Sequence, residues 1–190
     1  MAAQDQAIRT NWIRHNIDKE DISPLCILCG ERGETVSHIV SECKELAQND
    51  YKKVRHDKVA AILHWNMCKK YGFPTTSKSY EHFVDKEKTV LENKEVKLLW
   101  DVSIQTENKI EHNKPDLVLL DKKGKTCYII DVACPFDTRV EKKEKEKFEY
   151  YNDLKYEVIK VWKSEVTKVY IIPIVIGALG TVTKNITKYL

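Results

Sequence analysis

Two apolar segments joined by a short charged turn constrain the fold of this 190-residue chain more than any other feature. The segments are residues 116–121 and 126–134, and the sequence KKGK at 122–125 lies between them. Glycine accepts the positive φ that a two-residue hairpin turn requires, so we expect an antiparallel strand pair that turns at this glycine. Because side chains alternate across a strand, this register places Asp116 directly opposite Asp131, with Cβ atoms about 4.5–5.5 Å apart.

The two aspartates would share one face of the hairpin with apolar side chains. Two carboxylates facing each other beside an apolar surface repel, and a shared divalent cation removes this repulsion. Oxygen ligands suit Mg²⁺ or Mn²⁺, so the pair indicates a metal site formed by Asp116 and Asp131. The alternative is that Asp116 caps a turn after Pro115 and that Asp131 lies in water at a strand end. The apolar residues of the shared face are Val118, Leu120, Cys127 and Ile129.

The elements expected around the hairpin indicate a mixed α/β fold. A strand is expected over residues 98–105, a long helix over 139–163, and a buried strand over the β-branched run 168–176. A short last helix follows. The order strand, strand, strand, long helix, strand, helix is typical of an α/β layer fold whose sheet contains a hairpin.

Lys147 lies on the apolar stripe of the expected long helix, whereas Lys142 and Lys145 point to solvent. At about 100° per residue, its direction lies within about 20–40° of four apolar side chains. A lysine there either extends to the rim of the helix or points at the two aspartates. In the second case it would hold a water molecule or stabilise charge on a phosphate. The four apolar side chains are Val140, Tyr151, Leu154 and Val158.

The N-terminal part contains a compact set of metal-ligand residues, spaced Cys26-x2-Cys29-x8-His38-x4-Cys43. Three thiolates and one imidazole supply the four ligands of a tetrahedral zinc site, and the first spacing suits a tight knuckle. The alternative is that these are small buried side chains. The other three thiols, Cys68, Cys127 and Cys134, occur in apolar patterns and are expected in the core.

A basic cluster lies at the start of a second expected helix, over residues 51–71; a first helix is expected over residues 2–16. The cluster either contacts phosphates or forms a solvated helix face with an Arg–Asp pair. The chain has 32 Lys and Arg against 29 Asp and Glu, a net charge of +3, so any nucleic-acid surface must be local. The cluster consists of Lys52, Lys53, Arg55, His56 and Lys58.

Composition excludes a secreted disulfide scaffold and a membrane-spanning chain. The N-terminus lacks the pattern of a secretory signal, and no apolar run reaches the length of a membrane span. We therefore expect an intracellular protein with reduced cysteines. We expect three parts: a helical zinc-knuckle module with the basic helix (1–74), a connecting segment (75–97) and an α/β core (98–190).

Pro115-Asp116, Asp131-Val132-Ala133 and Lys147 together resemble the PD-(D/E)xK nuclease motif. The lysine lies on the following helix, as in the restriction-like endonuclease of non-LTR retrotransposons. Glu146-Lys147 and Tyr150-Tyr151 stand in the positions of that branch's Glu-Lys and Lys-Tyr pairs, with Tyr150 where a lysine is usual. The resemblance extends to features outside the core: the Cys26, Cys29, His38, Cys43 knuckle, the triplet Arg55-His56-Asp57 and the C-terminal run 172–181.

The resemblance implies a nuclease-like mixed sheet flanked by helices, with a zinc knuckle before it. It implies a Mg²⁺- or Mn²⁺-dependent DNA endonuclease, a hydrolase in which Asp116 and Asp131 hold the metal and Lys147 acts on water or phosphate. It also implies a nuclear location and a larger polyprotein whose reverse transcriptase uses an RNA template. DNA is the expected partner, and no membrane partner is expected. The alternative is a catalytically inactive, zinc-stabilised DNA-binding remnant.

Overall fold

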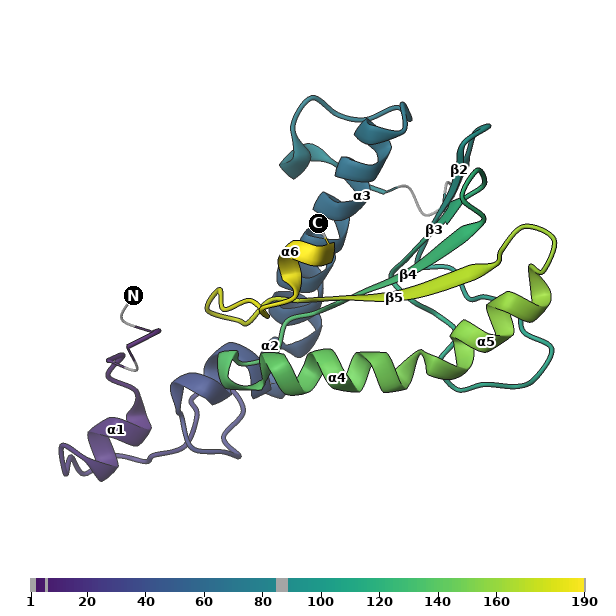
Figure 1. The fold of residues 1–190 in the computed structure, drawn as a ribbon. Coiled ribbons are helices and arrows are strands. Elements are labelled where there is room, and N and C mark those ends of the chain that lie inside the picture. Colours follow the sequence, from purple (N-terminus) through teal and green to yellow (C-terminus); the bar gives the residue numbers. More distant parts are fainter. Residues whose placement is uncertain (1–2, 6, 85–88, 190) are drawn as a thin grey trace.

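The computed structural model describes residues 3–5, 7–84 and 89–189, and a mixed sheet forms its centre (Figure 1). The sheet order is β1-β2-β3-β4-β5, in which neighbouring strands are antiparallel except that β4 and β5 are parallel. This is the mixed α/β architecture that the sequence predicts. The strands are β1 (Val90–Glu92), β2 (Val96–Trp100), β3 (Leu117–Asp121), β4 (Thr126–Ala133) and β5 (Lys168–Val175).

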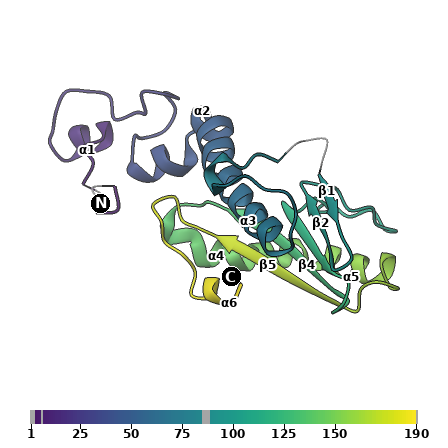
Figure 2. The same ribbon diagram turned by 90° about the horizontal axis from the view of Figure 1, so that it is seen from above.

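Helices cover both faces of the sheet (Figures 1 and 2). Helix α3 (Asp57–Lys70) and the short α6 (Ile186–Tyr189) pack on one face. Helices α4 (Val140–Tyr150) and α5 (Asn152–Val161) lie along the other face, where residues of α5 complete a second apolar cluster. Because both faces are buried, the strands consist of nearly continuous apolar residues.

The N-terminal part of the chain lies beyond one end of the sheet (Figure 2). It contains α1 (Asn11–Asn16), the π-helix η1 (His38–Glu42), α2 (Lys44–Leu46) and the π-helix η2 (Ala47–His56), which runs directly into α3. Two short 3₁₀ segments, η3 (Ser79–Glu81) and η4 (Asp137–Arg139), occur later in the chain. No helix in the described ranges is both long and apolar enough to span a membrane.

The hairpin register is the one expected from the sequence, although the turn is different. Leu117 pairs with Ile130, and Asp121 pairs with Thr126. The connection is a loop of residues 122–125 rather than a two-residue turn, and Lys125 has the positive φ (49°) that we expected of the glycine. A longer loop with the same centre leaves the register unchanged.

Several expected elements have different bounds. The helix expected over 51–71 forms as the π-helix η2 from Ala47 followed by α3, which ends at Lys70. Of the helix expected over 2–16, only α1 forms among the described residues, because Thr10 caps it by accepting a hydrogen bond from the Ile13 N–H (3.4 Å); residues 2 and 6 lie outside them. The strand expected over 98–105 ends at Trp100, because Asp101 has a φ of 51°. The helix expected over 139–163 is broken at Tyr151, which separates α4 from α5.

The division into three parts stays a prediction, and part of the connecting segment, residues 85–88, lies outside the described residues. Helix α3, which that division groups with the zinc-knuckle module, packs on the sheet: its buried Ala60 and Cys68 belong to the same apolar cluster as Leu98 and Ile130. The N-terminal part is therefore joined to the core by a helix that is itself part of the core.

Candidate active site and zinc centre

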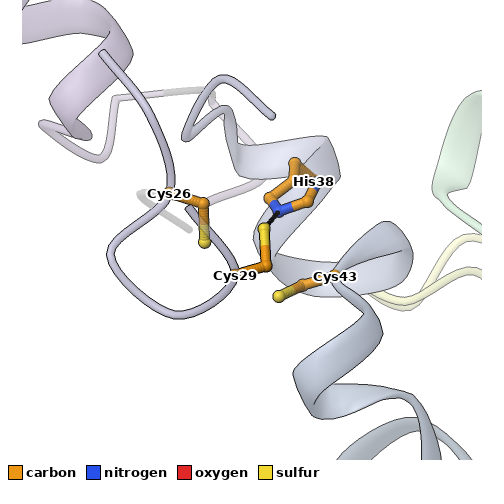
Figure 3. Close-up of side chains that lie close together, drawn as sticks. All are labelled: Cys26, Cys29, His38 and Cys43. Carbon is orange, nitrogen blue, oxygen red and sulfur yellow. Dashed lines mark hydrogen bonds between the residues drawn. The ribbon is translucent and has the colours of Figure 1, made fainter. Parts of the chain in front are cut away.

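Cys26, Cys29, His38 and Cys43 converge in the N-terminal part (Figure 3). One ligand atom from each of the four lies within 4.8 Å of the others, and the Cys29 Sγ is 3.3 Å from the His38 Nε2. Gly30, with a φ of 66°, lets the chain turn sharply after the first two cysteines, and its N–H donates to the Cys26 carbonyl (2.8 Å). The cluster could hold a metal such as zinc, as its spacing predicts.

The π-helix η1 sets the spacing between the last two ligands. The Cys43 N–H donates to the His38 carbonyl (2.9 Å), which is the i to i+5 bond of a π-turn, so the two side chains lie one turn apart. Backbone N–H groups, foremost that of Glu31, lower the pKa of Cys29 to about 6, which favours the metal-binding thiolate.

The hairpin register carries Asp116 and Asp131 to the end of the β3–β4 pairing. Asp116 lies directly before β3, and its Oδ2 accepts a hydrogen bond from the Val132 N–H (2.7 Å). Asp131 belongs to β4, on the face of the apolar residues Val118 and Ile129, and only 6% of its side chain is exposed. Asp116 therefore lies near enough to Asp131 for its charge to act on that carboxylate.

Lys147 reaches this pair from α4. Its Nζ lies 2.5 Å from the Asp131 Oδ2, whereas Lys142 and Lys145 are exposed. Of the two alternatives for Lys147, the structure thus shows the inward orientation. Tyr151, at the break between α4 and α5, donates its hydroxyl to the other oxygen of Asp131, Oδ1 (2.5 Å). The sequence pattern identifies Tyr151 only as an apolar residue of the stripe, because a pattern does not show where a hydroxyl points.

Burial raises the pKa of Asp131, and the neighbouring charge of Asp116 raises it further, while Lys147 and Tyr151 act in the opposite direction. The Asp131 Oδ2 is paired with the Lys147 ammonium, which acts on it both as a charge and as a hydrogen-bond donor. Two neighbouring carboxylates supply the oxygen ligands that a divalent cation needs.

His56, at the end of η2, also contacts the acid pair. Its Nε2 lies 3.2 Å from the Asp116 Oδ2, and its Nδ1 lies 2.9 Å from the Asp57 carboxylate. The hydrogen bond to Asp116 is the largest cause that raises the pKa of His56, to about 9, so the imidazole is protonated at neutral pH. We expected His56 among the phosphate contacts. Its contact with Asp116 could not be predicted from the sequence, because the two residues are 60 positions apart and no local pattern connects them.

The other residues of the basic cluster divide into two groups. The Arg55 Nη1 donates to the Val40 carbonyl (2.5 Å), and its guanidinium lies over the Tyr51 ring, so Arg55 ties η2 to η1. By contrast, three lysines are exposed. Contact of this cluster with DNA phosphates stays a prediction. The exposed lysines are Lys52, Lys53 and Lys58.

Tyr150, which stands where the resembling nucleases have a lysine, contacts the Tyr151 ring edge-on (centroids 5.1 Å apart), and the Lys147 Nζ lies 5.4 Å from the centre of its ring. Its ring stacks on His112 with a centroid separation of 3.3 Å and is 43% exposed. Comparison with known proteins adds no assignment: no protein-family model matches the chain, and no curated protein matches it. The functional argument therefore rests on the geometry of the two sites.

Proposed function

We propose that this protein is a divalent-metal-dependent endonuclease that hydrolyses phosphodiester bonds in DNA. One observation carries the proposal: Asp116, Asp131 and Lys147, from three separate elements, meet in one site. Two carboxylates and one amine at the end of a β-hairpin form the residue set that metal-dependent phosphodiester hydrolysis requires.

Asp116 and Asp131 would hold Mg²⁺ or Mn²⁺, which supplies Lewis-acid polarisation of the scissile phosphate. Lys147 would place the attacking water and offset the negative charge that develops on phosphorus oxygens. The water oxygen forms the new bond to phosphorus, the bond from phosphorus to the 3′-oxygen breaks, and that oxygen leaves as a hydroxyl. Tyr151 would fix the orientation of Asp131 through its hydrogen bond to Oδ1.

The surroundings of the acid pair support a DNA substrate. A pocket of about 560 Å³ lies next to the pair, lined by Ala133, by Glu146 and by three basic side chains of η4 and α4; the three proposed catalytic residues do not line it. Basic side chains in such a position neutralise the phosphate backbone irrespective of base sequence. The three are Arg139, Lys142 and Lys143.

The biological setting is also part of the proposal and rests on the resemblance alone. A nick that leaves a 3′-hydroxyl provides a primer for reverse transcription. The polymerase would be the reverse transcriptase of a longer polyprotein, copying its RNA template at nuclear DNA.

A nicking assay on supercoiled plasmid with Mg²⁺ or Mn²⁺ tests the proposal. Asp116→Asn and Asp131→Asn should each lower the nicking rate by more than about a hundredfold while leaving the fold intact. Lys147→Ala should lower the rate similarly and leave metal binding in place, because the amine is not a ligand. The matched control is Lys145→Ala, on the exposed face of the same helix, which should retain wild-type activity.

A second candidate function is DNA binding without cleavage, and a specific observation favours it. The Asp116 Oδ2 already has two partners, the Val132 N–H and the His56 imidazolium, and the Asp131 Oδ2 has the Lys147 ammonium. These cations compete with Mg²⁺ for the same oxygens. Plasmid binding that persists without nicking at any Mg²⁺ or Mn²⁺ concentration would support this candidate and contradict the nuclease.

A further inference from the structure

A second group of metal-ligand side chains lies away from both sites. His64 and Cys68 are four residues apart on α3, so they project from the same face of the helix. His82 approaches them from the segment that follows η3. One ligand atom from each of the three lies within 4.8 Å of the others. Sequence analysis treated Cys68 only as a core thiol, because nothing in the sequence indicates that His82 folds back onto α3.

Two of the distances between the three donors can be compared with those around a zinc ion. The His64 Nδ1 lies 2.8 Å from the His82 Nε2 and 3.5 Å from the Cys68 Sγ. In a tetrahedral site with usual bond lengths, two nitrogens lie about 3.3 Å apart and a nitrogen and a sulfur about 3.5 Å apart. The nitrogen–sulfur distance matches this geometry, and the two nitrogens would have to move apart by about 0.5 Å to match it as well.

The Cys68 sulfur lies beside both nitrogens of the His64 ring, 3.5 Å from Nδ1 and 3.8 Å from Nε2. The His64 Nδ1 has two close neighbours, but it carries either one lone pair or one hydrogen, so it can bond only one of them. His64 and Cys68 are 3% and 0% exposed, so water reaches the group only from the side of the half-buried His82.

We propose that His64, Cys68 and His82 bind a second zinc ion, separate from that of the Cys26, Cys29, His38, Cys43 knuckle. Imidazole and thiolate ligands select zinc over Mg²⁺ or Ca²⁺. The described residues supply three ligands, and water takes the fourth position. The role is structural: the ion fastens the segment before β1 to α3, next to Trp100 of β2, whose ring contacts His64 edge-on. This inference does not depend on the proposed nuclease activity.

Metal analysis of the full chain tests the proposal. The purified protein should contain two zinc equivalents. Cys68→Ser and His82→Ala should each reduce this number to one, and so should Cys26→Ser in the knuckle. The matched control is Cys134→Ser, a thiol that belongs to neither group, and it should keep both equivalents.

Cobalt substitution distinguishes the two sites by their thiolate content. Three thiolates would bind at the knuckle and one at the second site, so Cys68→Ser should remove about a quarter of the thiolate-to-cobalt charge-transfer absorption. If Cys68→Ser does not fold, because Cys68 is fully buried, the zinc stoichiometry of His82→Ala tests the proposal instead. His82 is only half-buried, so its replacement disturbs the core less. A single zinc equivalent in the wild-type chain, or two equivalents that persist in both variants, would overturn the proposal.

Discussion

Each oxygen of the buried Asp131 carboxylate has a different partner, and the hydroxyl of Tyr151 is the partner of Oδ1. Tyr151→Phe removes this donor while keeping the ring in the core. We expect the free energy of unfolding to fall by about 2 kcal/mol, because a buried hydrogen bond to a charged group is lost. Nicking should fall about tenfold without a change in KM, since Tyr151 positions Asp131 rather than binding DNA.

Tyr150→Phe is the matched control for this prediction, because Tyr150 is the exposed neighbour and stacks on His112 through its ring. Its unfolding free energy should stay within about 0.5 kcal/mol of the wild-type value. Urea denaturation and initial nicking rates give both quantities. Equal effects of the two substitutions would show that the Tyr151 hydroxyl has no special role.

The direction of a single side chain could be predicted from the sequence where a repeating pattern fixes it. Lys147 follows the 3.6-residue period of its helix, and Asp131 follows the alternation of its strand, so both could be placed on the correct face. The hydroxyl of Tyr151 and the imidazole of His56 have partners on other elements. Their contacts depend on how those elements pack, which no local period encodes.

The β3–β4 hairpin has the expected register although a different residue of its turn has the positive φ. Lys125 adopts a φ of 49° because its carbonyl accepts the N–H groups of Thr167 and Lys168, at the start of β5. Lys125→Gly should therefore raise the free energy of unfolding by about 0.5–1 kcal/mol, because glycine adopts this conformation without strain. Lys123→Gly, in the same loop without a positive φ, should not stabilise. Equal midpoints of urea denaturation for the two variants would contradict the explanation.

Helix α5 is linked to the segment between β2 and β3 by a buried carboxylate. The Glu157 oxygens accept hydrogen bonds from Lys160 and from the Asn108 side chain and backbone, and these lower the pKa of Glu157 to about 2. A depressed pKa stabilises the fold above the unfolded-state pKa of about 4.3. This contribution is lost as the pH falls from about 4.3 towards 2.

Glu157→Gln should therefore unfold more easily than the wild type at pH 7, and the difference should shrink below pH 4. Exposed Glu149 on the neighbouring helix provides the control, and Glu149→Gln should change neither quantity. Urea denaturation at pH 7 and at pH 3 gives the comparison. A difference that is the same at both pH values would assign the effect of Glu157 to packing rather than to its charge.

At the element scale, long apolar patterns were predictable and short or interrupted ones were not. The register of β3 and β4 follows from their apolar alternation. Strand β1 has only the three residues Val90–Glu92, too few to show a pattern, and Val96 was not expected at the start of β2. The break at Tyr151 lies inside a continuous apolar stripe, so the sequence alone predicts one uninterrupted helix.

Across the whole molecule, two contacts join the zinc knuckle to the proposed active site. Arg139, before α4, forms an ion pair with Glu42 of η1 (2.9 Å), and His56 of η2 contacts Asp116 (3.2 Å). The apolar stripe of residues 57–70 predicts a buried helix but does not specify which surface buries it. The packing of α3 on the sheet, and with it the position of His56, could therefore not be predicted from the sequence.

These contacts predict that loss of the knuckle's zinc affects nicking as well as local folding. Cys26→Ser should remove the knuckle metal and unfold residues 24–46, because the folding of such small sites depends on the metal. Hydrogen exchange should then increase in this region, while the sheet, which has its own apolar core, stays protected. The substitution is more selective than a chelator, which would also remove zinc from a second site.

The effect on nicking should pass through His56, because η1 and η2 hold the helix end that carries it. At saturating plasmid and Mg²⁺, Cys26→Ser should lower the nicking rate about tenfold, and it should have little further effect in a His56→Ala background. Such non-additivity is the signature of two positions that act through one contact. Cys26→Ser could instead unfold the knuckle and leave the nicking rate at saturating DNA equal to that of the wild type. The knuckle would then serve only DNA binding, and the contact between His56 and Asp116 would not couple its folding to nicking.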